Sequence, residues 1–418
     1  MRPAETIATL ASFENRGAGT DAERRAAVEL ALVMDRERVQ RQRATAIEPF
    51  WCRPNWALAH AWHAAFGLAG SLVATTSARV GGAMVLVALL SLVADALTGV
   101  SLGRRLTPEH ASQNVVSEGT PGPSDDPSRV RLIITANYDA GRTGLVYRDS
   151  IRRPFAQLAN AFGRRIPGWL GWLAMALIWV LAIAVLRVAG HKGSALGALQ
   201  LVPTVGLVLA LAALLELATA GWGPSANDNG SGVGAAVALV NALDAAAPRR
   251  LAVDLVLQGA SDGDGIGLRS YLRARRSSRR APNTIVLGLD ASAAGSPVWF
   301  VSDGALIPLA YFRQLRGLCA AVSRDDSQAD ARPYRGRGSA PALAARWRRL
   351  PAIALAARDP QGMAPRSHQR TDTSDSIDAR AADRVVEFGL LLVDQIDAYL
   401  GSRAAPAEGT PTARSTPA

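Results

Sequence analysis

Four long apolar stretches interrupt this chain of 418 residues and constrain its architecture more than any other feature. They cover residues 57–78, 80–103, 166–186 and 193–215, and the only charged residue within them is Asp95. A helix that crosses a bilayer needs about 20 predominantly apolar residues. Buried core helices are the alternative, and that alternative is most credible for the first stretch, where His60 and His63 lie near the start. We predict four membrane-spanning helices.

The four stretches come in two pairs, each joined by a very short turn near Arg79 or His191. This spacing predicts two transmembrane helical hairpins, over residues 57–103 and 166–221. Each hairpin returns the chain to the side that it left, so the remaining parts share one compartment. Arginines are frequent between the hairpins and scarce in their turns, which by the positive-inside rule indicates a cytoplasmic location for the soluble parts. The sequence therefore predicts a multi-pass protein of the cell membrane, with the lipid bilayer as its partner.

The net charge of +11 does not indicate nucleic-acid binding. Nearly all basic residues are arginines, Lys192 being the only lysine, and they are spread along the chain instead of clustering beside aromatic residues. Cys52 and Cys319 are the only cysteines, too few for a disulfide framework or a cysteine-rich zinc module. We expect no nucleic-acid partner, and the sequence sets no oligomeric state.

The soluble segments alternate between strand-like and helix-like patterns. Strands are predicted over residues 130–136, 251–260, 284–290 and 352–357, with a short edge strand over 298–301, and helices over 21–43, 230–243, 306–322 and 379–400. Such alternation favours an α/β fold with a mostly parallel sheet and helices on both faces. This domain would be built from three segments, residues 1–56, 104–165 and 222–401. The composition of residues 402–418 predicts a disordered tail.

Polar residues follow the predicted strands where each of them ends. They are Asn137 and Asp139, then Ser261 and Asp262, then Asp290, while Asp228 lies in a polar turn after the second hairpin and His368 follows the last strand. Each taken alone could be a turn former or a helix cap. The carboxyl ends of parallel strands meet at one edge of a sheet. Carboxylate oxygens and an imidazole nitrogen gathered there would suit zinc.

The order and spacing of these motifs resemble metallopeptidase family twenty-eight, which comprises zinc-dependent exopeptidases such as aminopeptidases. The segments that carry the resemblance are ITANYDAGRTG at 134–144, SANDNGSGVGAA at 225–236, QGASDGDGIGLRSY at 258–271, LGLDAS at 287–292 and SHQRTDTSDSID at 367–378. They stand in the places of the family's His-x-Asp motif, bridging aspartate, Glu-Glu pair, third ligand strand and last histidine. The resemblance implies a zinc-exopeptidase-like fold that the two hairpins interrupt.

The resemblance also implies a role for each site residue. Asp228 would be the bridging metal ligand, and Asp262 and His368 would complete one metal site with it. Asp290 would belong to the second site, whose expected histidine is Asn137 here. In the remaining positions, Asp139 keeps the family's supporting aspartate and Ser261 replaces its general base, a glutamate.

Two of these positions depart from the family's pattern. The neutral amide oxygen of Asn137 is a poor zinc ligand, so we expect one zinc ion per chain, with two or none as the alternatives. Ser261 lacks the basicity of a carboxylate, and general bases contribute roughly 10²–10⁴-fold. Asp264, in the same turn, is a candidate for a displaced base. Hydrolysis of peptide or amide bonds should therefore be weak or lost.

Two functions remain open from the sequence. The first is a membrane-embedded metallopeptidase that hydrolyses a peptide substrate, and the second is an inactive pseudopeptidase that serves as a membrane-tethered binding or scaffolding module. The basic segment 331–349 could be a lid, a lipid-headgroup contact or a solvated loop. Asp95 and Glu216, near the ends of apolar stretches, either reach water or make helix–helix contacts.

Overall fold

One mixed β-sheet organises the soluble part of the chain. The computed structural model describes residues 2–41, 43–119, 129–191, 193–276, 283–325 and 330–404. Its strands are β1 (Arg43–Cys52), β2 (His110–Gly119), β3 (Val130–Asn137), β4 (Leu251–Gln258), β5 (Thr284–Leu289), β6 (Ser296–Asp303), β7 (Leu309–Ala310), β8 (Arg332–Arg335) and β9 (Ala352–Arg358). Their order across the sheet is β1-β2-β4-β3-β5-β9-β6-β7, and β8 pairs with β6.

The prediction of a mostly parallel sheet was wrong. The central strands β4, β3, β5 and β9 are parallel to one another. On one side β1 and β2 run antiparallel to their neighbours, and on the other β6 is antiparallel to β9 and β7 but parallel to β8. The helical connection from β1 to β2 returns to the end of the sheet that it left, and a short turn reverses the chain between β5 and β6. A short apolar run predicts a buried strand but not its direction, so the sequence pattern could not distinguish these cases.

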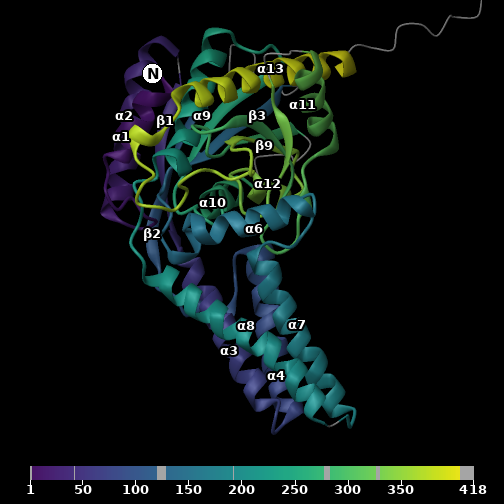
Figure 1. The fold of residues 1–418 in the computed structure, drawn as a ribbon. Helices are drawn as coiled ribbons and strands as arrows, with labels where there is room; N and C mark the ends of the chain where they lie inside the picture. Colours follow the sequence, from purple (N-terminus) through teal and green to yellow (C-terminus); the bar gives the residue numbers. More distant parts are fainter. Residues whose placement is uncertain are drawn as a thin grey trace, which may run out of the picture.

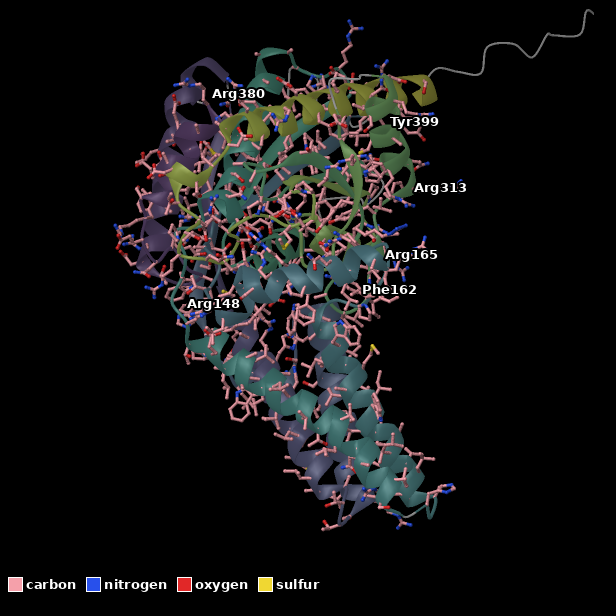
Figure 2. The ribbon with its side chains drawn as sticks, viewed as in Figure 1. Arg148, Phe162, Arg165, Arg313, Arg380 and Tyr399 are labelled. Carbon is pink, nitrogen blue, oxygen red and sulfur yellow. The ribbon has the colours of Figure 1, made fainter. Side chains whose placement is uncertain are left out.

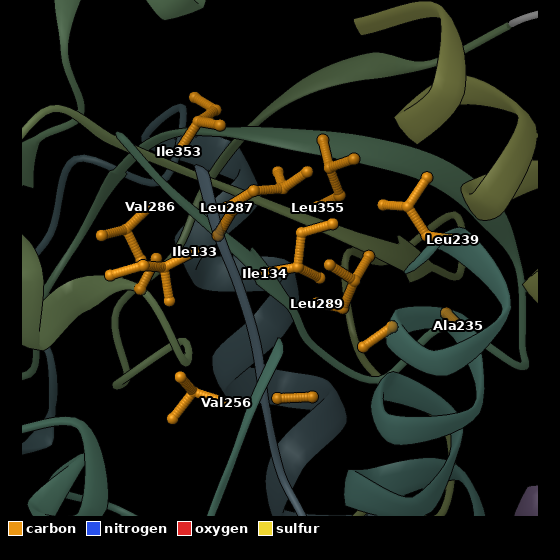
Figure 3. Packing of buried hydrophobic residues seen from close by; sticks show 14 of the residues in the cluster. Ile133, Ile134, Ala235, Leu239, Val256, Val286, Leu287, Leu289, Ile353 and Leu355 are labelled. Carbon is orange, nitrogen blue, oxygen red and sulfur yellow. The ribbon is translucent and has the colours of Figure 1, made fainter. Parts of the chain in front are cut away.

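The core of the domain lies on both faces of the central strands. Successive side chains of a strand point to opposite faces, yet Ile133 and Ile134 of β3 are both fully buried. They pack in one cluster with Val286, Leu287 and Ile353 of the adjoining strands (Figure 3). Burial on both faces explains why these strands read as continuous apolar runs in the sequence.

Helices cover the two faces of this sheet. The helices of the soluble part are α1 (Pro3–Ala11), α2 (Asp21–Arg41), α5 (Leu102–Arg105), α6 (Asp149–Ala161), α9 (Gly232–Ala245), α10 (Ile266–Ala274), α11 (Arg313–Asp325), α12 (Leu343–Trp347) and α13 (Ala379–Ala404). α9, α11 and α13 lie on one side of the sheet, and α10 and α12 lie on the other (Figure 1). The prediction of helices on both faces is confirmed.

Several predicted elements have different boundaries or roles. The expected edge strand over 298–301 is the longer β6, which lies inside the sheet between β9 and β7. The helix expected from residue 306 begins only at Arg313, because Leu309–Ala310 pairs with β6 as β7, directly after Pro308. The segment 331–349 contains β8 and α12, and the backbone N–H groups of Gly338 and Ala340 donate to the Asp303 carboxylate. Most of the predicted tail, residues 405–418, lies outside the described residues.

A bundle of four helices projects from one end of this domain (Figure 1). It consists of α3 (Trp56–Val73), α4 (Ala78–Thr98), α7 (Trp169–Val188) and α8 (Ser194–Thr219). α3 packs against α4 and α8, and α7 packs against the same two helices. The apolar interior of the bundle, which includes Leu92, Leu177 and Leu207, forms a cluster of its own, separate from the core of the domain.

Among the described residues, three helices are long and apolar enough to cross a membrane, namely α4, α7 and α8. The prediction of four such helices is therefore not supported. α3 is the exception, because it ends at Val73 after 18 residues and directs the polar side chains of His60 and His63 into the bundle. The outward-facing side chains of the other three helices are largely apolar and exposed, as Ile178 and Leu209 illustrate.

Candidate metal centre

Three of the predicted metal ligands come together at the end of the sheet that faces the bundle. His368 Nε2 lies 3.7 Å from Asp228 Oδ2 and 3.6 Å from Asp262 Oδ1. All three side chains are 14–15% exposed, so solvent or a small ligand can reach them. The hydroxyl of Ser367 donates a hydrogen bond to the Asp228 carboxylate and fixes its direction. We call this group the first half of the site.

The orientation of His368 leaves one ring nitrogen for a ligand. Its Nδ1 lies 3.0 Å from the carbonyl oxygen of Arg142, which assigns the proton to Nδ1 and the lone pair to Nε2. The ring also stacks on Tyr147, with centroids 4.2 Å apart and planes 12° from parallel. Burial would lower the pKa of His368, but Asp262 and Asp228 raise it above its ordinary value. A histidine held in this way by a backbone carbonyl is typical of metal ligands.

Gly141 makes room for this arrangement. A Cβ atom at this position would lie 2.3 Å from Cε1 of His368 and 3.2 Å from Oδ1 of Asp262. Such a distance to the ring is far below van der Waals contact, so a larger residue would displace the imidazole. The glycine of ITANYDAGRTG thus allows the backbone to approach the site closely.

The donor types of the first half, two carboxylates and one imidazole, suit zinc. Two ligands of a tetrahedral zinc ion lie roughly 3.3 Å apart, because each bond to nitrogen or oxygen is about 2.0–2.1 Å long. The distances of 3.6 and 3.7 Å from His368 exceed this separation by only a few tenths of an ångström. As they stand, no three or more His, Cys, Asp or Glu side chains of the described residues are placed so that they could hold a metal ion. Small side-chain shifts would be needed to close the first half around an ion.

The second half of the site, Asn137 with Asp290, does not fit a metal ion. The guanidinium of Arg358 donates to the Asp290 carboxylate, and its Nη1 also donates to the carbonyl oxygens of Ala291 and Ala357 at 3.1 and 2.8 Å. Burial would lower the pKa of Arg358, but the adjacent Asp290 raises it, so the group stays charged. Sequence reasoning missed this arginine, although it directly follows the apolar run of β9.

Asn137 is also engaged with the protein. Its amide nitrogen donates to the carbonyl oxygen of Ser261 at 3.3 Å. Its Oδ1 atom is buried and has no hydrogen-bond partner in the part of the chain that the structure describes. An amide that reaches the neighbouring turn in this way occupies the position where the resemblance places a histidine. Together with the Arg358–Asp290 pair, this leaves the second half filled by the chain's own groups.

Asp139 supports the turn that carries Asp262. Its carboxylate accepts hydrogen bonds from the backbone N–H groups of Ser261 and Asp262, both at 3.0 Å, and it is fully buried. Burial, together with the negative charges of Glu23 and Asp262, raises the pKa of Asp139 well above its ordinary value. The position predicted for a supporting aspartate therefore acts on the backbone of the turn and does not face a ligand.

Ser261 is directed away from the site. Its hydroxyl donates to the carbonyl oxygen of Gly259 at 3.0 Å and accepts from the backbone N–H of Gly267 at 2.9 Å, at the start of α10. Its exposed fraction is 0%. The serine that replaces the family's general base therefore closes a helix terminus instead of facing a substrate.

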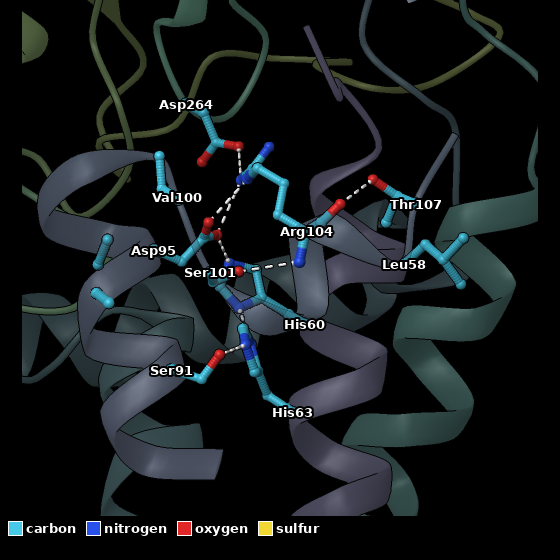
Figure 4. A network of polar contacts seen from close by, with 12 residues as sticks. Leu58, His60, His63, Ser91, Asp95, Val100, Ser101, Arg104, Thr107 and Asp264 are labelled. Atoms are coloured by element: carbon cyan, nitrogen blue, oxygen red, sulfur yellow. Dashed lines mark hydrogen bonds and ion pairs between the residues drawn. The ribbon is translucent and has the colours of Figure 1, made fainter. Parts of the chain in front are cut away.

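Asp264 is engaged in a buried polar network at the top of the bundle (Figure 4). Arg104 donates to Asp264 and, at 2.8 Å, to both carboxylate oxygens of Asp95. Asp95 also lies 3.3 Å from His60 Nε2. Because its carboxylate is paired with Arg104, Asp264 does not serve as a displaced base in this arrangement. Asp95 makes the helix–helix contact that the sequence left as one of two alternatives.

The first half lies directly against the bundle. The indole N–H of Trp56, the first residue of α3, donates to the Asp262 carboxylate. Arg142, whose carbonyl holds His368, donates to the carbonyl oxygen of Ala220 just after α8. The backbone N–H of Leu145 lies 3.3 Å from both carboxylate oxygens of Glu216 in α8. Glu216 thus connects the bundle to the segment beside the site.

Residues 215–393, which contain four of the predicted ligands, match the model of the family described as Peptidase family M28. Over these residues, the chain is similar to the M28 peptidases. Among solved structures, the zinc aminopeptidase from Bacillus subtilis matches with a TM-score of 0.54 and 12% identity, covering 94% of both chains. The LapA aminopeptidase from Legionella pneumophila matches with a TM-score of 0.51 and 10% identity, covering 95% of this chain and 71% of its own. No match was found among curated proteins.

These comparisons confirm the family resemblance that the motifs predicted. At 10–12% identity, the structural matches establish the M28-like fold and not the activity. The matched relatives are described as aminopeptidases, one of them as a zinc enzyme, which agrees with zinc as the metal suited to the first half.

Proposed function

We propose that this M28-like chain is a membrane-tethered protein that holds one zinc ion and binds peptides or other amides at the bilayer surface. We further propose that it hydrolyses them far more slowly than a peptidase with a complete site. The observation that carries this proposal is the contrast between an accessible cluster of Asp228, Asp262 and His368 and a fully buried Ser261.

The three residues of the first half would hold the ion, with His368 contributing Nε2. A zinc ion bound there would supply a Lewis acid that polarises the carbonyl of a bound amide. The protein holds this donor set in place, because Ser367 directs Asp228, the Arg142 carbonyl directs His368, and Asp139 supports the turn of Asp262. Outer contacts of this kind maintain ligand geometry and affinity.

Hydrolysis also needs a group that removes a proton from the attacking water. The hydroxyl of Ser261 is engaged with α10, and the Asp264 carboxylate is paired with Arg104. A positioned general base contributes roughly 10²–10⁴-fold to a rate. Ligand binding does not require this group, whereas fast turnover does. We therefore infer that binding is the retained property of the site.

The first test is the zinc content of the full-length, detergent-purified protein, measured by elemental mass spectrometry together with hydrolysis of aminoacyl substrates. We expect about one zinc per chain, lost in His368→Ala, and turnover at least about 10²-fold below that of the Bacillus subtilis aminopeptidase assayed beside it. Turnover equal to that enzyme and abolished by Asp228→Ala would contradict the slow-hydrolysis proposal. No zinc after dialysis against the metal would contradict the zinc proposal and favour an inactive scaffold.

The membrane arrangement is part of the same proposal. The packing of α3 between α4 and α8 supports a bundle that enters the bilayer as a unit, with α3 as its shortest member. Arginines gather at the end of the bundle that meets the domain, which supports a cytoplasmic domain. These are Arg104, Arg105, Arg148, Arg152, Arg153, Arg164 and Arg165. Reporter fusions to either end of the chain should report the cytoplasm, and a reporter active outside the cell would contradict this orientation.

A further inference from the structure

α6 exposes an apolar stripe that none of the described residues covers. Ile151, Phe155, Leu158 and Phe162 are 39%, 59%, 45% and 60% exposed, and their spacing of four, three and four residues places them on one side of the helix. Ala156 and Ala159 on a different side of α6 are buried. Contiguous exposed apolar surface of this kind marks an interaction site.

Polar contacts fix α6 rigidly on the domain. The guanidinium of Arg152 donates to the carbonyl oxygens of Ser367 and Ala364 at 3.2 and 2.9 Å. The side-chain amide of Asn160 donates to the carbonyl oxygen of Gln361 at 3.0 Å. The stripe is therefore a fixed surface, and α6 directly supports the loop that carries His368.

The position of α6 identifies what covers the stripe. The helix lies crosswise where the domain meets the bundle (Figure 1), and Figure 2 labels Arg148 and Phe162 near its two ends. From Phe162 the chain reaches the apolar helix α7 within seven residues. Trp169 and Trp172 in the first turn of α7 are 41% and 49% exposed, as expected for aromatic residues at a bilayer boundary. The stripe thus continues the lipid-facing surface of the bundle.

Charge at the ends of α6 points to the same partner. Arg148 and Arg165 flank the two ends of α6 and are exposed, whereas Arg153 within the helix pairs with Asp149 at 2.9 Å. An amphipathic helix with apolar residues on one side and arginines on another lies in the interfacial plane, and anionic headgroups strengthen its binding. A second copy of the chain would not need this basic border.

We propose that α6 lies in the plane of the bilayer, with its stripe at the boundary between headgroups and acyl chains and with the flanking Arg148 and Arg165 on anionic lipid phosphates. This inference rests on the membrane tether of the proposed function. It adds that the site is held at the membrane surface by a second contact besides the bundle. Because α6 contacts Ser367 and Ala364, bilayer contact and the geometry of the His368 loop are linked.

The test uses the full-length protein in nanodiscs that contain phosphatidylcholine and phosphatidylglycerol. Spin labels are attached to Phe155→Cys in the stripe, to Gln157→Cys on the polar side of α6 and to Ile178→Cys on the outer surface of α7. The native Cys52 and Cys319 are buried. Any labelling of these two cysteines is measured on the unmodified chain. Collisions with oxygen, which concentrates in lipid, are compared with collisions with a water-soluble nickel chelate.

We expect the ratio of oxygen to nickel collisions at Phe155→Cys to be several-fold higher than at Gln157→Cys and close to that at Ile178→Cys. A lipid-like ratio at Ile178→Cys with a water-like ratio at Phe155→Cys would overturn the role of α6 and leave the tether standing. A water-like ratio at Ile178→Cys would overturn the tether itself. Shielding of Phe155→Cys from both reagents would identify a protein contact and also overturn the inference.

Discussion

The two halves of the candidate metal centre differ in the source of their positive charge. In the first half, the carboxylates of Asp228 and Asp262 are contacted by Ser367, His368 and Trp56. None of these three contacting side chains carries a permanent positive charge. In the second half, the guanidinium of Arg358 is paired with Asp290. The first half is open to a metal ion from solution, whereas the second already contains a cation that is part of the chain.

This difference shows how the charge of a buried carboxylate at a sheet edge can be met without a metal ion. A buried carboxylate needs a counter-charge, and removing one partner of a buried ion pair costs roughly 3–5 kcal/mol. Arg358 meets this need permanently, because a guanidinium does not lose its proton in proteins. The half that depends on a dissociable ion can be loaded and emptied, and the half that depends on Arg358 cannot.

Matched substitutions in the two halves should give opposite results. Asp228→Asn is expected to weaken zinc binding by more than about 10²-fold, because losing a ligand should exceed the 10–100-fold cost of losing an outer contact. Asp290→Asn is expected to leave zinc binding unchanged but to lower the free energy of unfolding by roughly 3 kcal/mol, because Arg358 stays buried without its partner. Zinc titration and thermal unfolding in detergent measure the two effects.

The control for folding is the double variant Asp290→Asn with Arg358→Met. Replacing both members of a buried ion pair with groups of similar volume is often neutral. The methionine would lie among the rings of Phe300 and Tyr334, whose centroids are 5.6 and 5.4 Å from the Arg358 guanidinium carbon. Loss of zinc from this double variant would mean that the halves are coupled and that the comparison fails.

The sequence predicted the elements near the ligands better than their partners. The strands that lead to Asn137, Asp262 and Asp290 could be read from short apolar runs followed by polar residues. Arg358 could not be assigned, because one arginine after an apolar run carries no signal in a chain with 46 basic residues. The Arg104–Asp264 pair spans 160 residues and depends on the bundle and the domain folding against each other.

The same limit explains the missed helix α6. Its segment contains several arginines and Pro154, so average hydropathy gives no helix signal there. The spacing of Ile151, Phe155, Leu158 and Phe162 was the available signal, because apolar residues three or four positions apart indicate one face of an amphipathic helix. Strand direction was likewise unavailable, because it depends on where each connection returns the chain.

The smallest expected effect comes from opening the second half to a metal ion. Asn137→His alone should leave the zinc content at about one ion per chain, because the guanidinium of Arg358 is still paired with the Asp290 carboxylate. Asn137→His combined with Arg358→Met should add a second, weaker ion, since an imidazole and a free carboxylate are then available beside Asp228. Elemental analysis across a zinc titration measures the stoichiometry. A second ion in the single variant would show that the guanidinium is displaced easily and would remove the basis of the comparison. One ion in both variants would show that the backbone around Asn137, and not Arg358, keeps the second half closed.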